Sequence, residues 1–292
     1  MARIVIENLK YRYPEAKTLA LDNISLTIEE GEFLGIVGRN DAGKSTFCQA
    51  IVGLVPNFYK GAYGGKILVG DIEVKKAGVH QVCRKVGLVF QNPFNQVTGS
   101  KLKVYDEIAF GLENMGIPKD EMINRIDEAM ELLDISRLKD RSPFSLSGGQ
   151  MQRMAIASII AMRPEVIILD EPTSQLDPEG SEEVFSAVQK LSKKGITIIM
   201  VEHKIEKVAA YSHRVALMDN GRIVSVDTPQ RLFSREDLSS YGVEPPVYTK
   251  IFQGLGIKDD KTSLYPVTLE EAKALLSSKA EKGGPSYGNL GG

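Results

Sequence analysis

The sequence has little cysteine: only Cys48 and Cys83 occur in 292 residues. Two cysteines are too few for a disulfide framework, and their spacing matches no metal-binding motif, so we expect two buried free thiols. No stretch approaches the roughly 18 apolar residues of a membrane-spanning helix, and the N-terminal segment is charged where a signal peptide is apolar. These absences predict a cytoplasmic protein that meets a membrane only through a partner.

The sequence also lacks a large excess of charge of either sign, because its formal net charge is only -2. Bulk charge therefore provides no overall attraction to nucleic acid or to anionic lipid. Apolar residues are plentiful: 42% of the chain is hydrophobic and 25% is charged. This composition is sufficient for a substantial core, either in one large domain or in a domain with an appendage.

Two kinds of strand are predicted. Short stretches rich in β-branched residues and separated by turn formers favour antiparallel strands at 3–9, 23–30 and 65–71. Nearly continuous apolar runs favour parallel strands covered on both faces, at 32–38, 85–91, 165–171 and 196–203. Since ligands bind beyond the carboxyl ends of parallel strands, we expect one crevice to collect the polar residues at these ends: Gly38, Gln91, Asp170, Glu171 and His203.

Helix and turn signals complete the expected architecture. Apolar residues at three-and-four spacing predict an amphipathic helix within 118–138. The pair Asn220-Gly221 between two apolar runs predicts a hairpin over 215–226. Thr268 and Glu271 have the spacing of a capping box at the start of a C-terminal helix, and the glycine-rich end is predicted to be a mobile tail.

Residues 35–46, GIVGRNDAGKST, raise the question of function. The pattern G-x-x-x-x-G-K-[ST] follows a predicted strand and precedes a predicted helix, which is the context of a phosphate-binding loop. Lys44 would neutralise the β and γ phosphates, Ser45 would place its hydroxyl on Mg²⁺, and Thr46 could reach the α phosphate. The expected ATP-binding residues are Gly38, Arg39, Asn40, Asp41, Ala42, Gly43, Lys44, Ser45 and Thr46.

Asp41 conflicts with this interpretation, because it places a negative charge in a loop that would bind anions. The phosphate donors in such a loop are main-chain N–H groups, and Asp tolerates the left-handed backbone better than most residues. We therefore expect Asp41 to weaken nucleotide affinity and not to abolish the site.

Two further stretches fit a nucleotide-hydrolysing site. Asp170 ends a strand where a carboxylate can support Mg²⁺, and Glu171 is placed to polarise the attacking water. Ser147 lies three residues before Gln150, which predicts a capping box at a helix start whose N–H groups form a second anion site. The alternatives are that the two acids are simply solvated at a strand end and that Ser147 begins an ordinary helix. An ordinary helix start gives no reason for Gly148 and Gly149, which cost helix stability.

Together these motifs resemble an ATP-binding cassette (ABC) ATPase over about residues 1–227. The residues that carry the resemblance are the loop at 38–45, LSGGQMQR at 146–153, ILDEP at 168–172, SQLD at 174–177, and His203. The resemblance implies an α/β P-loop NTPase fold with a parallel-sheet core, an antiparallel β subdomain, a helical signature subdomain at about 96–160, and a small C-terminal extension. The extension would span 228–281, followed by a flexible tail at 282–292.

The same resemblance implies roles for individual residues. Two cassettes would enclose two ATP molecules head to tail, with the signature residues of one chain reaching the γ phosphate bound by the other; these are Ser147, Gly148, Gly149 and Gln150. Tyr13 would stack on adenine, with a core aromatic as the alternative, and Asp177 would link the two sites. Gln91 would sense Mg²⁺ and the attacking water, His203 would contact the γ phosphate, and Glu171 would act as the base. The implied magnesium residues are Ser45, Gln91 and Asp170.

A narrower resemblance, to the ATPase subunits of energy-coupling-factor (ECF) vitamin and metal-ion importers, rests on FQNPFNQV at 90–97 and VYDEIAFGLENMGI at 104–117. It implies a protein on the cytoplasmic face of the membrane, with a transmembrane coupling subunit and a substrate-capturing membrane protein as partners. The coupling subunit would dock beside the segment that follows Gln91. The second ATPase subunit could be a second copy or a related cassette, and the transported substrate would be selected by another polypeptide. Asp41 and Gln175 depart from the family pattern.

Other functions remain open. A soluble ABC ATPase acting on nucleic acid or ribosomes usually joins two cassettes or carries a long coiled coil, and neither is present, so we expect no nucleic-acid partner. A nucleotide-binding partner cassette with little hydrolysis is a second alternative. A small-molecule kinase is the weakest one, because LSGGQ has no role in it.

Overall fold

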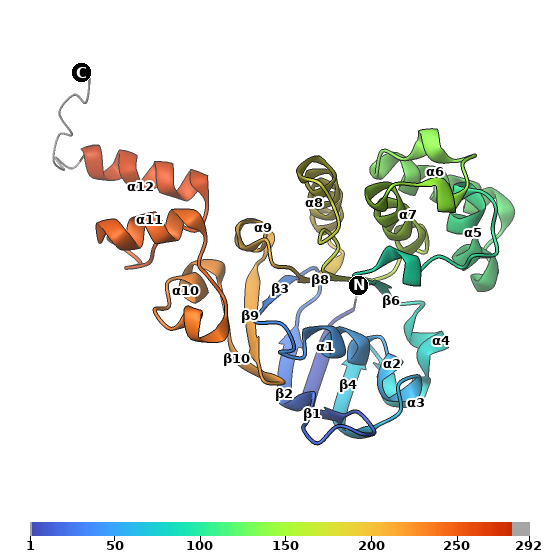
Figure 1. The fold of residues 1–292 in the computed structure, drawn as a ribbon, viewed down its shortest axis with the longest axis horizontal. Helices are drawn as coiled ribbons and strands as arrows, with labels where there is room; N and C mark the ends of the chain where they lie inside the picture. Colours follow the sequence, from blue (N-terminus) through green and yellow to red (C-terminus); the bar gives the residue numbers. More distant parts are fainter. Residues whose placement is uncertain (1, 282–292) are drawn as a thin grey trace.

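The computed structural model describes residues 2–281, and the strands within this range form two sheets (Figure 1). The first sheet is antiparallel, with the order β2-β1-β4-β5. Its strands are β1 (Ile4–Arg12), β2 (Leu21–Ile28), β4 (Ala62–Val69) and β5 (Ile72–Glu73). The three predicted antiparallel strands are confirmed, with boundaries shifted by a few residues.

The second sheet has the order β10-β9-β3-β8-β7-β6 and is parallel except for the edge strand β10. Its strands are β3 (Phe33–Val37), β6 (Val86–Val89), β7 (Val166–Asp170), β8 (Thr197–Val201), β9 (Arg214–Asp219) and β10 (Arg222–Asp227). The four continuous apolar runs are therefore confirmed as parallel strands.

Alternate residues of the parallel strands pack into different clusters. Val166 and Ile168 of β7 join the cluster that contains the antiparallel sheet and helix α1 (Lys44–Ile51). Ile167 and Leu169 join the cluster beneath helices on the opposite face. Both faces of the sheet are thus buried, which explains why these strands are apolar along most of their length.

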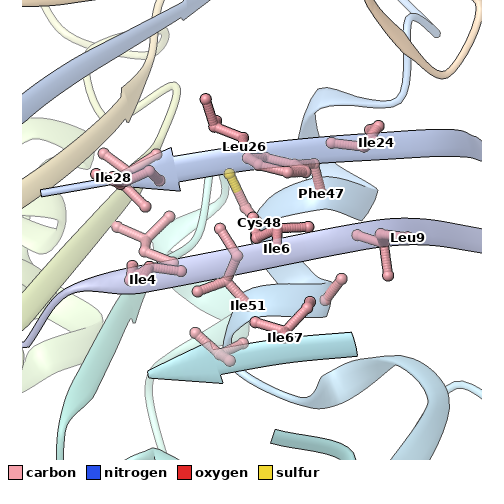
Figure 2. Packing of buried hydrophobic residues seen from close by; sticks show 14 of the residues in the cluster. Ile4, Ile6, Leu9, Ile24, Leu26, Ile28, Phe47, Cys48, Ile51 and Ile67 are labelled. Carbon is pink, nitrogen blue, oxygen red and sulfur yellow. The ribbon is translucent and has the colours of Figure 1, made fainter. Parts of the chain in front are cut away.

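Helix α1 lies between the two sheets. Figure 2 shows Phe47, Cys48 and Ile51 of this helix directed at the apolar side chains of β1, β2 and β4. Cys48 is buried as expected, but Cys83 is only half-buried, so the prediction of two buried thiols is wrong for Cys83. Short helices connect the early strands: α2 (Leu54–Asn57), α3 (Val74–Ala77) and α4 (Val79–Val82).

Helices cover the other face of the parallel sheet, and α5, α6 and α7 form a group at one end (Figure 1). The predicted amphipathic helix is α6, and its inward face buries Ile126, Ala129 and Met130. The helices of this face are α5 (Val104–Met115), α6 (Lys119–Leu132), α7 (Gly148–Ala161) and α8 (Pro178–Lys193). A shorter helix, α9 (Ile205–Tyr211), packs beside β3.

Strands β9 and β10 form the predicted hairpin. Asn220 and Gly221 have φ values of 46° and 75°, the left-handed backbone that favours this pair in a two-residue turn. The chain then leaves the sheet through α10 (Pro229–Phe233), α11 (Val247–Leu255) and α12 (Leu269–Glu281). Helices α11 and α12 share a small apolar cluster of their own, whereas Leu232 and Phe233 of α10 are buried in a cluster with Val37 of β3.

The predicted capping box at the start of α12 is only half formed. The Thr268 hydroxyl accepts a hydrogen bond from the Glu271 amide at 3.3 Å, as expected. The Glu271 carboxylate, however, accepts from the Val267 amide at 2.7 Å, one residue before the cap. The predicted tail at 282–292 lies outside the described residues. Within the described residues, no helix is long and apolar enough to cross a membrane.

Candidate nucleotide-binding site

The loop between β3 and α1 has a backbone that requires glycine at both ends. Gly38 and Gly43 have φ values of 149° and 97°. A Cβ atom added to Gly38 would lie 2.1 Å from the Met218 carbonyl oxygen, and one added to Gly43 would lie 2.5 Å from that of Ala20. Asp41 is exposed and also left-handed, with φ of 63°. The two glycines are therefore needed to form the loop in this position.

Lys44, the first residue of α1, is buried against the loop that precedes it. Its Nζ atom donates hydrogen bonds to the carbonyl oxygens of Gly38 and Arg39, each at 2.9 Å. Burial lowers the pKa of the Lys44 ammonium group, while the nearby carboxylates of Glu171 and Asp170 oppose this effect. The structure thus places the Lys44 ammonium group against the phosphate loop, at the N-terminus of α1.

Two acidic residues follow β7. Asp170 is buried, and desolvation raises the pKa of its carboxyl group, with a hydrogen bond from Ser45 acting in the opposite direction. Glu171 has a left-handed backbone with φ of 49°, and its amide donates to the Val201 carbonyl oxygen at 2.9 Å.

Donors from the two neighbouring strand ends hold the Glu171 carboxylate. Gln91, beyond β6, donates from Nε2 to Oε2 at 2.6 Å. His203, beyond β8, lies with Nε2 at 2.9 Å from Oε1. The structure therefore brings together three of the polar residues that were predicted to meet at the carboxyl edge of the sheet. Half of the His203 side chain remains exposed, so its ring is accessible from the cleft.

These groups line a cleft of about 1300 Å³. Its walls come from the phosphate loop, the start of α1, the polar strand ends, the β1–β2 connection and the β9–β10 hairpin. Tyr13 lines the cleft half-buried, and its hydroxyl lies 3.2 Å from the Thr46 hydroxyl. Tyr11 is the fully buried core aromatic, and its ring packs edge-on against Tyr13 at 4.8 Å between centroids. Of these two tyrosines, Tyr13 is therefore the one that reaches the cleft.

The predicted second anion site lies at the start of α7. Ser147 caps the helix by accepting from the Gln150 amide at 3.4 Å, and Gln150 accepts from the Ser147 amide at 3.2 Å, so the capping box is confirmed. Neither residue lines the cleft of its own chain. A Cβ atom added to Gly148 or Gly149 would meet nothing closer than 3.4 Å within the chain. Intrachain packing therefore gives no reason for these glycines.

Asp177, which was predicted to link the two sites of a dimer, has a local structural role within the chain. Asp177 caps α8, because its Oδ1 atom accepts from the Gly180 amide at 2.8 Å.

In the segment after Gln91, Phe94 is 56% exposed. Glu107 is buried and accepts from the Thr98 amide at 2.6 Å and the Thr98 hydroxyl at 2.9 Å. Glu107 therefore holds this segment through Thr98, and Phe94 and Leu102 are apolar side chains of the segment that are exposed.

A family model described as ABC transporter matches residues 21–174, more than half of the chain. The chain belongs to the ABC transporter family. Its fold is that of an ABC ATPase, and the predicted fold class is confirmed.

Relatives of this ABC ATPase match it over most of its length. It is 42% identical over 282 residues to the energy-coupling factor transporter ATP-binding protein EcfA1 of Streptococcus mutans, covering 94% of this chain and 98% of the relative. It is 41% identical over 250 residues to a putative ABC transporter ATP-binding protein of Pyrococcus abyssi, covering 85% and 89%. These relatives confirm an ATP-binding transporter subunit related to ECF ATPases.

Solved ABC structures agree with this fold. The structure of cbiO1 from Clostridium perfringens, part of the ABC transporter complex cbiONQ, has a TM-score of 0.69 at 36% identity, covering 80% of this chain and 92% of that one. The dimeric ATP-binding cassette MJ0796, bound to ADP and Pi, has a TM-score of 0.67 at 25% identity, covering 77% and 98%.

The surroundings of Asp170 fit a magnesium ion shared with a nucleotide. The Oδ1 atom of Asp170 is buried and has no hydrogen-bond partner, and the same carboxyl group is hydrogen-bonded by Ser45. Among the described residues, no cluster of three or more His, Cys, Asp or Glu side chains could hold a metal alone. Mg²⁺ is usually bound by one or two carboxylates with phosphates and water, so this donor set is appropriate.

One wall of the cleft of this ABC ATPase was not predicted from the sequence. Residues 219–224 of the β9–β10 hairpin line the cleft, and Arg222 pairs there with Asp22 at 2.5 Å. The Asn-Gly turn predicted the hairpin itself. Nothing in the local pattern could show that the hairpin faces the phosphate loop, because that contact depends on the position of β9 beside β3.

Proposed function

We propose that this chain is the ATP-hydrolysing subunit of an ECF-type importer, in which closure of a cassette dimer moves helices of a transmembrane partner. The observation that carries this proposal is the similarity to EcfA1, which covers 94% of the chain and so includes most of the C-terminal extension. The relation to cbiO1, part of a transporter complex, supports it. The imported compound would be a vitamin or a metal ion captured by a separate membrane protein.

The cleft supplies the groups that ATP hydrolysis needs. Lys44 and the N–H groups of the phosphate loop would bind the β and γ phosphates. Magnesium would be held by Ser45 and Asp170, with Gln91 nearby, and would neutralise phosphate charge. The ring of Tyr13, which lines the cleft, would stack against adenine. Of the side chains that would make these interactions, all but the buried Asp170 already line the cleft: Tyr13, Lys44, Ser45 and Gln91.

Glu171 would accept the proton of the attacking water. Its two carboxylate oxygens are each contacted by one nitrogen, Gln91 Nε2 and His203 Nε2. Each oxygen has a further lone pair that could accept from a water molecule. Because His203 is half exposed, its ring could turn toward a γ phosphate while Gln91 keeps Glu171 in place. A positioned base of this kind typically contributes about 10² to 10⁴ in rate.

A complete site would need a second cassette. Ser147 and the two following glycines lie outside the cleft of their own chain, and the glycines leave room for the close approach of a ligand. The helix start they form would supply N–H groups to the γ phosphate bound by the opposite chain. The partner cassette would be a second copy or a related chain, and the assembly would work at the cytoplasmic face of the membrane.

The replacement Glu171→Gln tests the nucleotide step. It should reduce hydrolysis by about 10² to 10⁴ and should accumulate a dimer with ATP bound, because ATP is retained between the two chains. Size-exclusion chromatography with ATP and Mg²⁺ measures the dimer, with the unmodified chain as the control. A variant that stays monomeric with ATP would contradict the shared site. Purification of the tagged chain with its membrane partners would test the importer.

A partner cassette with low turnover is a second candidate, and Asp41 favours it. Its exposed carboxylate lies close enough to Lys44 to influence the charge of the ammonium group, and it would repel a bound phosphate. This candidate predicts ATP binding with little hydrolysis even in the assembled dimer. Measuring phosphate release by the purified complex distinguishes the two candidates.

A further inference from the structure

Arg39, the second residue of the phosphate loop, joins three parts of the fold. Its Nε atom pairs with Asp219 Oδ1 at 2.8 Å, at the end of β9. Its Nη2 atom donates to the Ser240 carbonyl oxygen at 2.5 Å, in the C-terminal extension. Ser240 lies 201 residues along the chain from Arg39. The phosphate loop is thus connected directly to a segment outside the nucleotide-binding fold.

The turn that receives Arg39 packs against it closely. The turn comprises Leu238–Tyr241 and ends at Gly242, which has φ of 67°. A Cβ atom added to Gly242 would lie 3.1 Å from the Cβ atom of Arg39. Leu238 and Val243 share a buried cluster with Val37, the last residue of β3 before the loop. The turn and the loop therefore rest on the same apolar cluster.

The backbone of Arg39 contacts the lysine of the proposed nucleotide site. Its carbonyl oxygen accepts a hydrogen bond from Lys44 Nζ at 2.9 Å. One residue thus contacts the phosphate-binding lysine through its backbone and the extension through its side chain. A ligand whose phosphates attract Lys44 would change the hydrogen bond between Lys44 and the Arg39 carbonyl oxygen. In the other direction, a turn that holds the Arg39 side chain restricts the movement of the phosphate loop.

We propose that Arg39 is a positioning residue that couples occupancy of the phosphate loop to the stability of the turn at 238–243. This coupling rests on the proposed function of the loop as a nucleotide site. Because coupling between two sites is reciprocal, bound nucleotide stabilises the turn, and the anchored turn favours nucleotide binding. The Arg39 side chain is 47% exposed, and exposed ion pairs correspond to effects of about twofold to fivefold.

Affinity alone does not identify the coupling, since Arg39→Ala also removes a positive charge near the phosphates. Hydrogen exchange of the turn separates the two effects. The amides of Gly242 and Val243 donate within the turn, to Ser239 and Leu238, and their exchange reports whether the turn opens. A variant that loses charge only would still transmit nucleotide binding to these amides.

The experiment compares hydrogen exchange of the full chain with and without Mg²⁺ and a non-hydrolysable ATP analogue, with analogue binding measured in parallel by equilibrium dialysis. The analogue should slow exchange at 238–243 by about twofold to fivefold in the unmodified chain, and this slowing should be absent in Arg39→Ala. The control is Arg231→Ala, which removes an exposed arginine of α10 whose pairing, with Asp227 at 3.9 Å, does not involve the loop. The Arg231→Ala variant should still show slower exchange at 238–243 when the analogue binds.

The outcomes separate the two proposals. If the analogue binds and exchange at 238–243 does not change, the coupling is refuted and the nucleotide site stands. The same conclusion follows if Arg39→Ala at saturating analogue responds like the unmodified chain. If the unmodified chain does not bind the analogue, the proposed function fails and the coupling fails with it.

Discussion

Replacing Asp41 tests how the phosphate loop balances backbone geometry against charge. Asp41 has φ of 63° and an exposed side chain. Its carboxylate would repel phosphate, but its backbone conformation is one that Asp and Asn adopt more readily than most residues. Asp41→Asn removes the charge and keeps this tolerance, while Asp41→Gly removes the whole side chain. Asp41→Ala removes the charge and introduces backbone strain.

The size of the charge effect follows from Coulomb's law. Two unit charges about 10 Å apart at an effective dielectric constant near 20 interact by roughly 1.7 kcal/mol. Exposure to water and salt reduces this to about 1 kcal/mol, or about fivefold in Kd. We expect Asp41→Asn and Asp41→Gly to tighten ATP binding by this factor. Asp41→Ala should show the same gain in affinity but a lower free energy of unfolding, because alanine in the left-handed region costs about 1–2 kcal/mol.

Equilibrium titration with a fluorescent ATP analogue at low and high salt provides the assay. The Debye length falls from about 30 Å at 0.01 M to about 3 Å at 1 M ionic strength, so the advantage of Asp41→Asn should shrink as salt is added. Unchanged or weaker binding by both Asn and Gly variants would refute this account of the residue. A gain that does not depend on salt would show that charge is not its cause.

Three other predictions concern the glycine turn, the cleft and the docking segment. Gly38→Ala should lower the free energy of unfolding by more than about 2 kcal/mol, because its Cβ would lie 2.1 Å from the Met218 carbonyl oxygen. Gly116→Ala, left-handed but with open space around it, should cost only about 1 kcal/mol, and equal losses in urea unfolding would contradict the steric argument. Tyr13→Ala should weaken nucleotide binding by about 1–3 kcal/mol while Tyr13→Phe largely retains it; equal affinities for the two variants would exclude stacking. Phe94→Ala should reduce transport by the assembled importer without lowering the unfolding midpoint, since that side chain is 56% exposed; full transport would place the docking surface elsewhere.

Sequence patterns predicted the features that depend on short stretches of chain. Continuous apolar runs identified β7 and β8 because a strand buried on both faces is apolar along most of its length. The spacing of Ser147 and Gln150 predicted a cap that is made within four residues. The predicted convergence of Gln91, Glu171 and His203 also succeeded, since parallel strands bring their carboxyl ends to one edge by topology.

The contacts that sequence analysis missed join distant parts of the chain. The link from Arg39 to Ser240 depends on where the extension packs, and no local periodicity contains that information. The partial exposure of Cys83 likewise depends on the end of a short helix and its neighbours. At the start of α12, the Glu271 carboxylate binds the amide before the cap and also Gln230 of α10. A tertiary contact thus competes with the local motif.

The alternation along β7 has a mechanical consequence. Val166 and Ile168 belong to the cluster around α1, and Ile167 and Leu169 to the cluster beneath α5, α6 and α7. One strand therefore contributes side chains to two separate apolar clusters on opposite faces of the sheet. A rigid-body rotation of the helix group would disturb only the cluster on its own side. If the dimer closure proposed above rotates this helix group, α1 with Lys44 at its start would remain packed in its own cluster.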